Sequence, residues 1–172
     1  NNNKKIKIIL DEINNNPIYY KLFHHHNQKH QIKELLRCII IINKLGLSYR
    51  NISQYTNIHW NIIYKFQLKL AKYNIFQTIF NKYKNEYINE MNDDIKFLYT
   101  DTTFILNKNG HELVSYNPQV KKHKTTKVSI IIDNFNNPIS VGVYKSTIHD
   151  VNIVKHQLDN LHKESPILFD NN

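Results

Sequence analysis

The sequence predicts an α+β protein, with helices in its first half and a mixed sheet in its second. Apolar residues recur every three or four positions over 31–45 and 59–72, a spacing typical of helices. After residue 95 the chain has four apolar or β-branched runs, FLYTDTT, KVSIIID, PISVGVY and PILFD, which favour strands. A helical module followed by a sheet-containing domain is therefore expected.

The composition allows one full domain and a small one in 172 residues. Lys and Arg number 23 against 14 Asp and Glu, so the formal net charge of +9 suits a polyanionic partner. Asn, Ile, Lys and Tyr all have AT-rich codons, so part of this basicity reflects coding bias. Cys38 is the single cysteine, which excludes an internal disulfide and fits a reducing compartment. Without a signal peptide or a membrane-length apolar run, we expect an intracellular protein with no membrane partner.

Residues 1–31 form a polar N-terminal segment. A histidine cluster lies in it and comprises His24, His25, His26 and His30. Four histidines could ligate zinc, but no cysteine or carboxylate stands at a metal-site spacing from them. The composition favours a solvated polar segment.

Residues 32–74 are predicted to form a helix-turn-helix module. Gly46 ends the first helix, Ser48 caps a second short helix through Tyr55, and a turn over 56–58 leads to a third helix over 59–72. Residues 75–94 then form a connecting helix that packs on the sheet and is closed by a turn at Asp93 and Asp94.

The third helix has an apolar and a basic face. Its apolar face comprises Ile62, Ile63, Phe66 and Leu70, and its opposite face comprises Asn61, Lys65, Lys69 and Lys72. In a major groove, Asn61 would address a base edge and the lysines would neutralise phosphates. The alternative is a three-helix support whose lysines are simply solvated. Trp60 and Tyr64 are expected in the core.

Two aspartates mark the sheet region. Asp101 interrupts the uncharged first run, where aspartate is depleted unless it has a use, and Asp170 ends the last run. A right-handed return through the helix after Asp150 would place the last strand parallel to the first. The two carboxylates would then share one end of the sheet, where they could hold a divalent metal.

Residues 95–170 resemble the first half of the ribonuclease-H-like catalytic domain of DDE transposases of the insertion-sequence IS4/IS5 type. The resemblance is carried by YTDTT, KKHKTTKVSIIID, NNPIS, STIHD and ILFD. The helical segment YRNIS…WNIIYKFQLKLAKYNIF also resembles the module that precedes this domain in the family.

The resemblance implies a partial ribonuclease-H-like domain over 95–172. It implies Asp101 and Asp170 as catalytic ligands of Mg²⁺ or Mn²⁺, with His149 in a supporting role. It also implies double-stranded DNA as the partner and a possible homo-oligomer on DNA, in the cytoplasm or nucleus of the host.

Other polar residues of this region have local interpretations. A basic loop either binds the DNA backbone or is solvated, and comprises Lys121, Lys122, Lys124 and Lys127. Asp133 is predicted to stabilise a turn and Asp150 to cap a helix. The apolar stripe of that helix is expected to pack on the sheet, and comprises Val151, Val154, Leu158 and Leu161.

The resemblance therefore implies a transposase-like protein that binds element DNA and cuts and joins strands by metal-dependent phosphoryl transfer. The family's third acidic residue, a glutamate on a later helix, has no counterpart before Asn172, and Glu164 precedes the last strand. Both ends are expected to be cut, and this chain alone is expected to lack strand transfer. The alternatives are a non-catalytic helix-turn-helix protein derived from a transposase, and a remnant that folds poorly.

Overall fold

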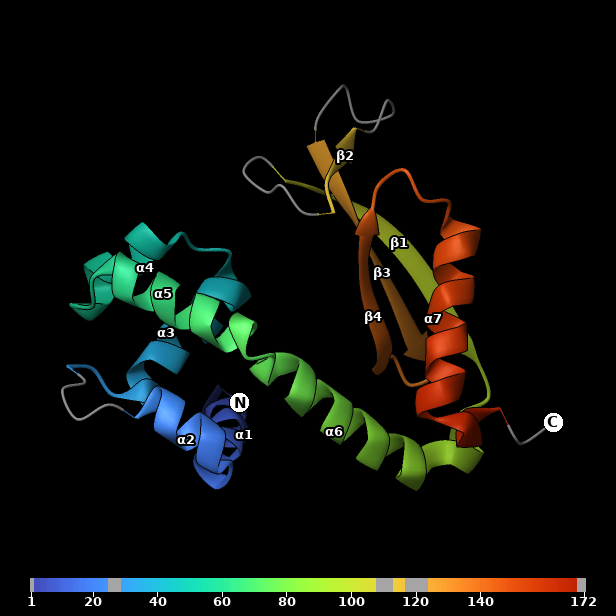
Figure 1. The fold of residues 1–172 in the computed structure, drawn as a ribbon, viewed down its shortest axis with the longest axis horizontal. Coiled ribbons are helices and arrows are strands. Elements are labelled where there is room, and N and C mark those ends of the chain that lie inside the picture. The colour runs from blue at the N-terminus through green and yellow to red at the C-terminus, as the bar shows by residue number, and fades with distance from the viewer. Residues whose placement is uncertain (1, 25–28, 108–112, 117–123, 170–172) are drawn as a thin grey trace. The chain divides into compact units, whose positions relative to one another are not determined.

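A computed structural model describes residues 2–24, 29–107, 113–116 and 124–169. The chain divides into two compact units, residues 1–82 and 83–172 (Figure 1). The first is helical and the second combines helices with an antiparallel sheet, which confirms the α+β prediction.

The first unit consists of helices that share one core. They are α1 (Asn2–Asn15), α2 (Pro17–Phe23), α3 (Ile32–Leu45), α4 (Tyr49–Thr56), α5 (Trp60–Lys72) and the first part of α6 (Ile75–Met91). Burying apolar side chains from every one of these helices compensates the entropy lost on ordering them.

The N-terminal segment is not the solvated polar stretch expected from its composition. Ile6, Ile9 and Ile13 follow helical spacing along α1 and are buried, as is Phe23 at the end of α2. The many Asn and Lys residues hide this stripe in the average composition, but they occupy the outer face of the helix. Both helices therefore belong to the core of the first unit.

The local signals that delimit α3, α4 and α5 are confirmed. Gly46 ends α3 with a left-handed φ of 65°, a conformation that costs glycine little. The Ser48 hydroxyl accepts a hydrogen bond from the Asn51 amide at 3.1 Å and so caps α4. Asn57, at φ 53°, ends α4 and begins the turn into α5.

The second unit is built on a central strand. It comprises the end of α6, η1 (Asn92–Asp94), β1 (Leu98–Leu106), β2 (Ser115–Tyr116), β3 (Lys124–Asp133), β4 (Pro138–Lys145), α7 (Asp150–Glu164) and η3 (Pro166–Leu168). Strand β3 pairs antiparallel with β1 on one side and β4 on the other, and β2 pairs with its first residues.

The expected last strand, PILFD, is not a strand where the structure describes it. Pro166–Leu168 form a short 3-10 helix, and the Phe169 amide donates to the Pro166 carbonyl at 2.8 Å. Proline has no N–H for a sheet ladder, and its fixed φ suits a first helical turn. The described strand pairs are consequently all antiparallel, so the mixed sheet is not found among these residues. Asp170 lies outside the described residues.

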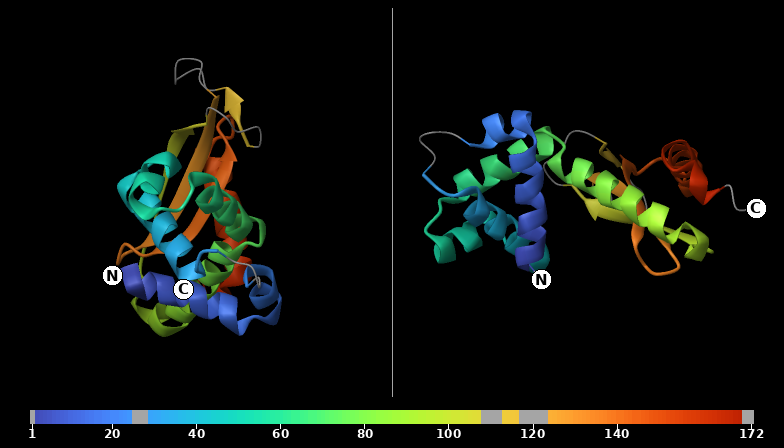
Figure 2. Two further views of the ribbon diagram at one scale, coloured as in Figure 1. Left: turned by 90° about the vertical axis from the view of Figure 1, so that its left-hand side faces the viewer. Right: turned by 90° about the horizontal axis from the view of Figure 1, so that it is seen from below.

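Helix α7 packs along one face of the sheet, as Figures 1 and 2 show, but with a different stripe from the one expected. Ile153, Gln157 and Leu161 are buried, whereas Val151 is 78% exposed. Gln157 takes this inward position because its side-chain amide forms hydrogen bonds to both β3 and β4. Its Oε1 accepts from the Ser129 hydroxyl at 2.5 Å, and its Nε2 bonds the Ser140 hydroxyl at 3.2 Å.

The last part of α6 packs within the second unit, as the connecting-helix prediction requires. Ile88 is buried with Ile139 and Leu161. One turn earlier, the buried Lys84 ammonium forms an ion pair with Glu164 at 2.6 Å. These contacts hold the end of α7 against α6.

Asp133 stabilises the turn between β3 and β4, as predicted. Its Oδ1 accepts hydrogen bonds from the Phe135 and Asn137 amides at 2.9 and 2.8 Å. Its Oδ2 accepts from the Tyr87 hydroxyl at 2.5 Å, which ties the turn to α6.

Candidate functional site

Helices α4 and α5 are consecutive, are joined by a short turn and pack with α3. Ile52 of α4 and the inward side chains of α5, Ile63, Phe66 and Leu70, are buried in one cluster with α3. Ile62, expected on the same face, is 37% exposed. Only residues 57–59 separate the two helices, so the first turn of α5 stands next to the end of α4.

The outer face of α5 presents polar and basic groups. Lys65 and Lys72 are exposed and Asn61 is half-buried. The His59 ring accepts a hydrogen bond from the Asn61 amide at 3.3 Å through Nδ1, and so caps the helix. Asn61, Lys65 and Lys72 thus keep the positions expected of a groove-facing helix.

Lys69 has a structural role that its place on this face did not reveal. Its ammonium donates to the Leu22 carbonyl of α2 and lies 5.0 Å from the centroid of the Phe23 ring. Burial lowers the pKa of this ammonium below its usual value. Lys69 thus ties α5 to α2 and differs in this from the exposed Lys65 and Lys72.

Lys65 and Lys69 should respond differently to the same substitution. If α5 contacts duplex DNA, Lys65→Ala should lower the slope of log affinity for that duplex against log salt by about 0.9, because one phosphate contact is lost. Lys69→Ala should leave that slope unchanged and lower the free energy of unfolding by about 1.5–3 kcal/mol, since a charged donor is lost. Salt titrations and urea unfolding followed by Trp60 fluorescence would measure both. Equal slope changes in the two variants would contradict the assignment.

An aromatic and cationic group at the α4–α5 turn was missed from the sequence. Trp60 is half-buried and Tyr64 is 40% exposed, so neither is the core residue expected. The Arg50 guanidinium lies over the Trp60 ring, and the Tyr49 and Tyr64 rings meet edge to face. Burial, with a smaller effect of Tyr64, raises the pKa of the Tyr49 hydroxyl. The sequence signal was the placement of Trp60 and Tyr64 one turn apart at the start of α5.

The net positive charge of the chain lies in the helical unit. Residues 1–82 contain 13 Lys and Arg and 3 Asp and Glu, a formal charge of +10, whereas residues 83–172 contain 10 and 11, a charge of −1. Lysines are divided almost equally between the two units, with 11 in the first and 10 in the second. Coding bias would explain the lysines but not the scarcity of acids. No Asp or Glu occurs between Glu34 and Glu86, which suits contact with a polyanion.

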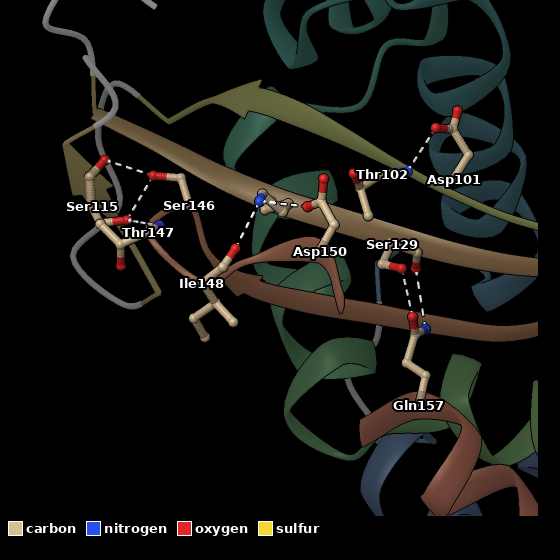
Figure 3. A network of polar contacts seen from close by, with 10 residues as sticks. Asp101, Thr102, Ser115, Ser129, Ser146, Thr147, Ile148, Asp150 and Gln157 are labelled. Atoms are coloured by element: carbon tan, nitrogen blue, oxygen red, sulfur yellow. Dashed lines mark hydrogen bonds and ion pairs between the residues drawn. The ribbon is translucent and has the colours of Figure 1, made fainter. Parts of the chain in front are cut away.

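Asp101 lies in the middle of β1, opposite Ile130 of β3. Its carboxylate is exposed, and Oδ1 accepts from the Thr102 amide at 2.8 Å. Because side chains alternate along a strand, Asp101 and Thr102 face opposite sides of the sheet. Figure 3 accordingly shows Asp101 pointing away from Asp150.

The face that carries Asp101 is apolar and open in the described part of the unit. Its exposed side chains come from all three long strands, and include Tyr99, Ile105, Ile130, Val141 and Val143. A carboxylate on such a face is accessible to a ligand or partner without any rearrangement of β1.

Lys127 is engaged within the protein rather than presented to DNA. It is only 5% exposed, and its ammonium donates to the Ile148 carbonyl and to Asp150 Oδ1, each at 2.7 Å. It also lies 4.9 Å from the centroid of the Phe104 ring. The hydrogen bond from Lys127 holds the pKa of the Asp150 carboxyl below its usual value. The expected role of Lys127 in DNA binding is replaced by anchoring of α7.

The segment between β4 and α7 is fixed at two points. The Ser115 hydroxyl lies 2.6 Å from the Ser146 hydroxyl and accepts from the Thr147 amide at 3.1 Å (Figure 3). Lys127 holds the Ile148 carbonyl at the other point. His149 occupies the N-cap position predicted for Asp150, without a side-chain cap, and its side chain is exposed. The structure brings His149 next to Asp150 but not to the face of Asp101.

Other expected ligands are dispersed or fall outside the description. Lys124 is exposed at the start of β3, and Lys121 and Lys122 lie outside the described residues. The His24 ring contacts Asn14 Oδ1 at 2.9 Å, and His25 and His26 also lie outside. Among the side chains described, no three His, Cys, Asp or Glu residues are grouped to hold a metal ion. A cation at Asp101 would need further ligands from outside the described residues. Asp170 is the ligand that the sequence analysis predicts.

Comparisons with protein-family models, with curated proteins and with solved structures found no match to this chain. Within the described residues, every helix is too short or too polar to cross a membrane.

Proposed function

We propose that this chain is a transposase-like protein that binds double-stranded DNA through α4 and α5. The observation that carries the proposal is the helix-turn-helix, whose second helix exposes Lys65 and Lys72 on the unit that holds the net positive charge. In this motif the second helix enters the major groove with its N-terminal residues at base edges, and the first helix crosses the backbone. Asn61 would then address a base, and the exposed lysines would contact phosphates.

The order of elements in the second unit supports the transposase part of the proposal. Three antiparallel strands, β1, β3 and β4, are followed by α7, which is the order expected for the start of a ribonuclease-H-like domain. Asp101 is exposed in the middle of the first strand, where the resemblance expects an acidic ligand of Mg²⁺ or Mn²⁺. When bound, such a cation would supply charge stabilisation for phosphoryl transfer.

DNA binding is tested by titrating the full chain into a fluorescently labelled duplex of mixed sequence over a series of salt concentrations. Log affinity should fall linearly with log salt, by about 0.9 for each phosphate contacted. An affinity that does not depend on salt would contradict the proposal. Selection from a pool of randomised duplexes would then identify a preferred sequence, because a helix in the major groove enriches a common motif.

The second candidate is a non-catalytic DNA-binding protein that retains this helix-turn-helix. It is favoured by the absence of a group of metal-ligating side chains among the residues described. Both candidates predict the same DNA binding, and they differ in whether Asp101 binds a divalent cation.

A further inference from the structure

The two helices of the proposed DNA-binding motif are joined by a contact between their first turns. Arg50 is the second residue of α4 and Trp60 is the first residue of α5. The guanidinium carbon of Arg50 lies 5.6 Å from the centroid of the Trp60 ring, within the range of a cation–π interaction. The His59 ring lies beside Trp60, with 5.5 Å between the centroids.

Among the residues described, Arg50 contacts an aromatic ring and forms no ion pair with a carboxylate. It is exposed, whereas Trp60 is half-buried and therefore fixed at its base by the helical unit. No acidic residue occurs in the sequence from 35 to 85 to neutralise it. A guanidinium stacked on a ring keeps its charge and its planar fork of N–H donors, and loses less side-chain entropy when it binds.

We propose that Arg50 is a phosphate contact of duplex DNA and that Trp60 is the residue that positions it. This rests on the proposed DNA binding of α4 and α5. A phosphate is favoured over a base because Arg50 stands at the start of α4, the helix that crosses the backbone in this motif, whereas Asn61 stands on the helix that enters the groove. The guanidinium fork matches phosphate oxygens.

The test compares Arg50→Ala with Arg37→Ala in the full chain. Arg37 is the only other arginine and lies exposed on α3, so both variants remove the same charge from the same unit. Affinity for a mixed-sequence and an A·T-rich duplex is measured over a salt series. Arg50→Ala should lower the salt slope by about 0.9 on both duplexes, and Arg37→Ala should lower it by less than half as much.

Trp60 is tested by Trp60→Leu and the conservative Trp60→Phe, each alone and combined with Arg50→Ala. Trp60→Leu should weaken binding about threefold, and Trp60→Phe should restore most of the affinity because a ring remains under the guanidinium. The loss in the Trp60→Leu, Arg50→Ala double variant should be smaller than the sum of the two single losses. Circular dichroism of each variant confirms that the helices are intact.

Trp60 is the single tryptophan, so its fluorescence reports on this contact directly. Its emission should change in Arg50→Ala without DNA, and on addition of duplex to the unsubstituted chain. Equal changes of the salt slope in Arg50→Ala and Arg37→Ala would overturn the phosphate contact. It would also be overturned if Arg50→Ala changed the relative affinity for the two duplexes and left the salt slope unchanged. Additive losses would overturn the role of Trp60. An unsubstituted chain that binds neither duplex would instead overturn the proposed function, and the inference with it.

Discussion

Asp133→Ala should lower the free energy of unfolding of the second unit by about 3–5 kcal/mol. The Asp133 side chain is fully buried and accepts from three donors, the Tyr87 hydroxyl and the amides of Phe135 and Asn137. Alanine would leave these donors without their acceptor in a site with little access to water, and each such loss costs about 1–3 kcal/mol without strict additivity.

Hydrogen exchange measured on peptides of β3 and β4 would detect this loss, whereas Trp60 fluorescence would not, because Trp60 belongs to the first unit. Tyr87→Phe is the graded comparison. This substitution removes one donor and leaves the hydrogen bonds from the two backbone amides of the turn. The free energy of unfolding should therefore fall by about 1 kcal/mol. Asp159 is exposed on α7, so Asp159→Ala should change the free energy of unfolding by less than about 0.5 kcal/mol. A loss in Asp133→Ala no larger than that of the Asp159 control would contradict the argument.

The same carboxylate should make the second unit sensitive to acid. Burial tends to raise the pKa of Asp133, but the hydrogen bonds from Tyr87, Asn137 and Phe135 outweigh it and lower the pKa. A pKa below the unfolded value means that the contribution to stability is present above the unfolded pKa and is lost as the pH falls through the folded pKa. Stability should therefore decline below about pH 4, and less so in Asp133→Ala.

Features that depend on neighbours in sequence were predictable. The helix ends at Gly46 and Asn57 and the cap at Ser48 follow from backbone preferences of single residues, and the structure has each of them where expected. The three long strands also begin and end within a few residues of the apolar runs. These signals are strong because each involves only a few consecutive residues.

Features that depend on tertiary partners were not predictable. Lys127 and Lys84 look like solvated lysines in the sequence, but each is buried against a carboxylate from α7, Asp150 or Glu164. Gln157 looks like a surface residue and instead bridges two strands, so the inward stripe of α7 differs from the apolar one. A polar side chain enters a core where a partner bonds it, and spacing alone does not reveal that partner.

The candidate site was predictable in its main element and not in its detail. Asn61, Lys65 and Lys72 are accessible on α5 as expected. The hydrogen bond from Lys69 to α2 and the contact of Arg50 with Trp60 could not be predicted from sequence spacing. The expected pairing of Asp101 with Asp170 stays a prediction, since Asp170 lies outside the residues described.

Asp101→Asn should abolish divalent-cation binding and leave the stability of the second unit unchanged. The Asp101 carboxylate is exposed, and within the residues described it accepts a hydrogen bond only from the neighbouring Thr102 amide. The Asn side-chain oxygen can accept the same hydrogen bond. The free energy of unfolding should therefore change by less than about 0.5 kcal/mol. Divalent cations prefer carboxylate oxygens, so removing one charge from a site with few ligands should remove what binding there is.

The measurement is a calorimetric titration of Mn²⁺ into the full chain, with Asp101→Asn, Asp170→Asn and the exposed control Asp159→Asn beside it. Weak Mn²⁺ binding that is lost in Asp101→Asn and Asp170→Asn but retained in Asp159→Asn would support the transposase hypothesis over the non-catalytic one. If Asp101→Asn and the unsubstituted chain bind Mn²⁺ equally, the cation lies elsewhere and Asp101 is not its ligand. A chain that binds no Mn²⁺ while binding duplex DNA would favour the non-catalytic candidate, because α4 and α5 need no metal to enter a groove.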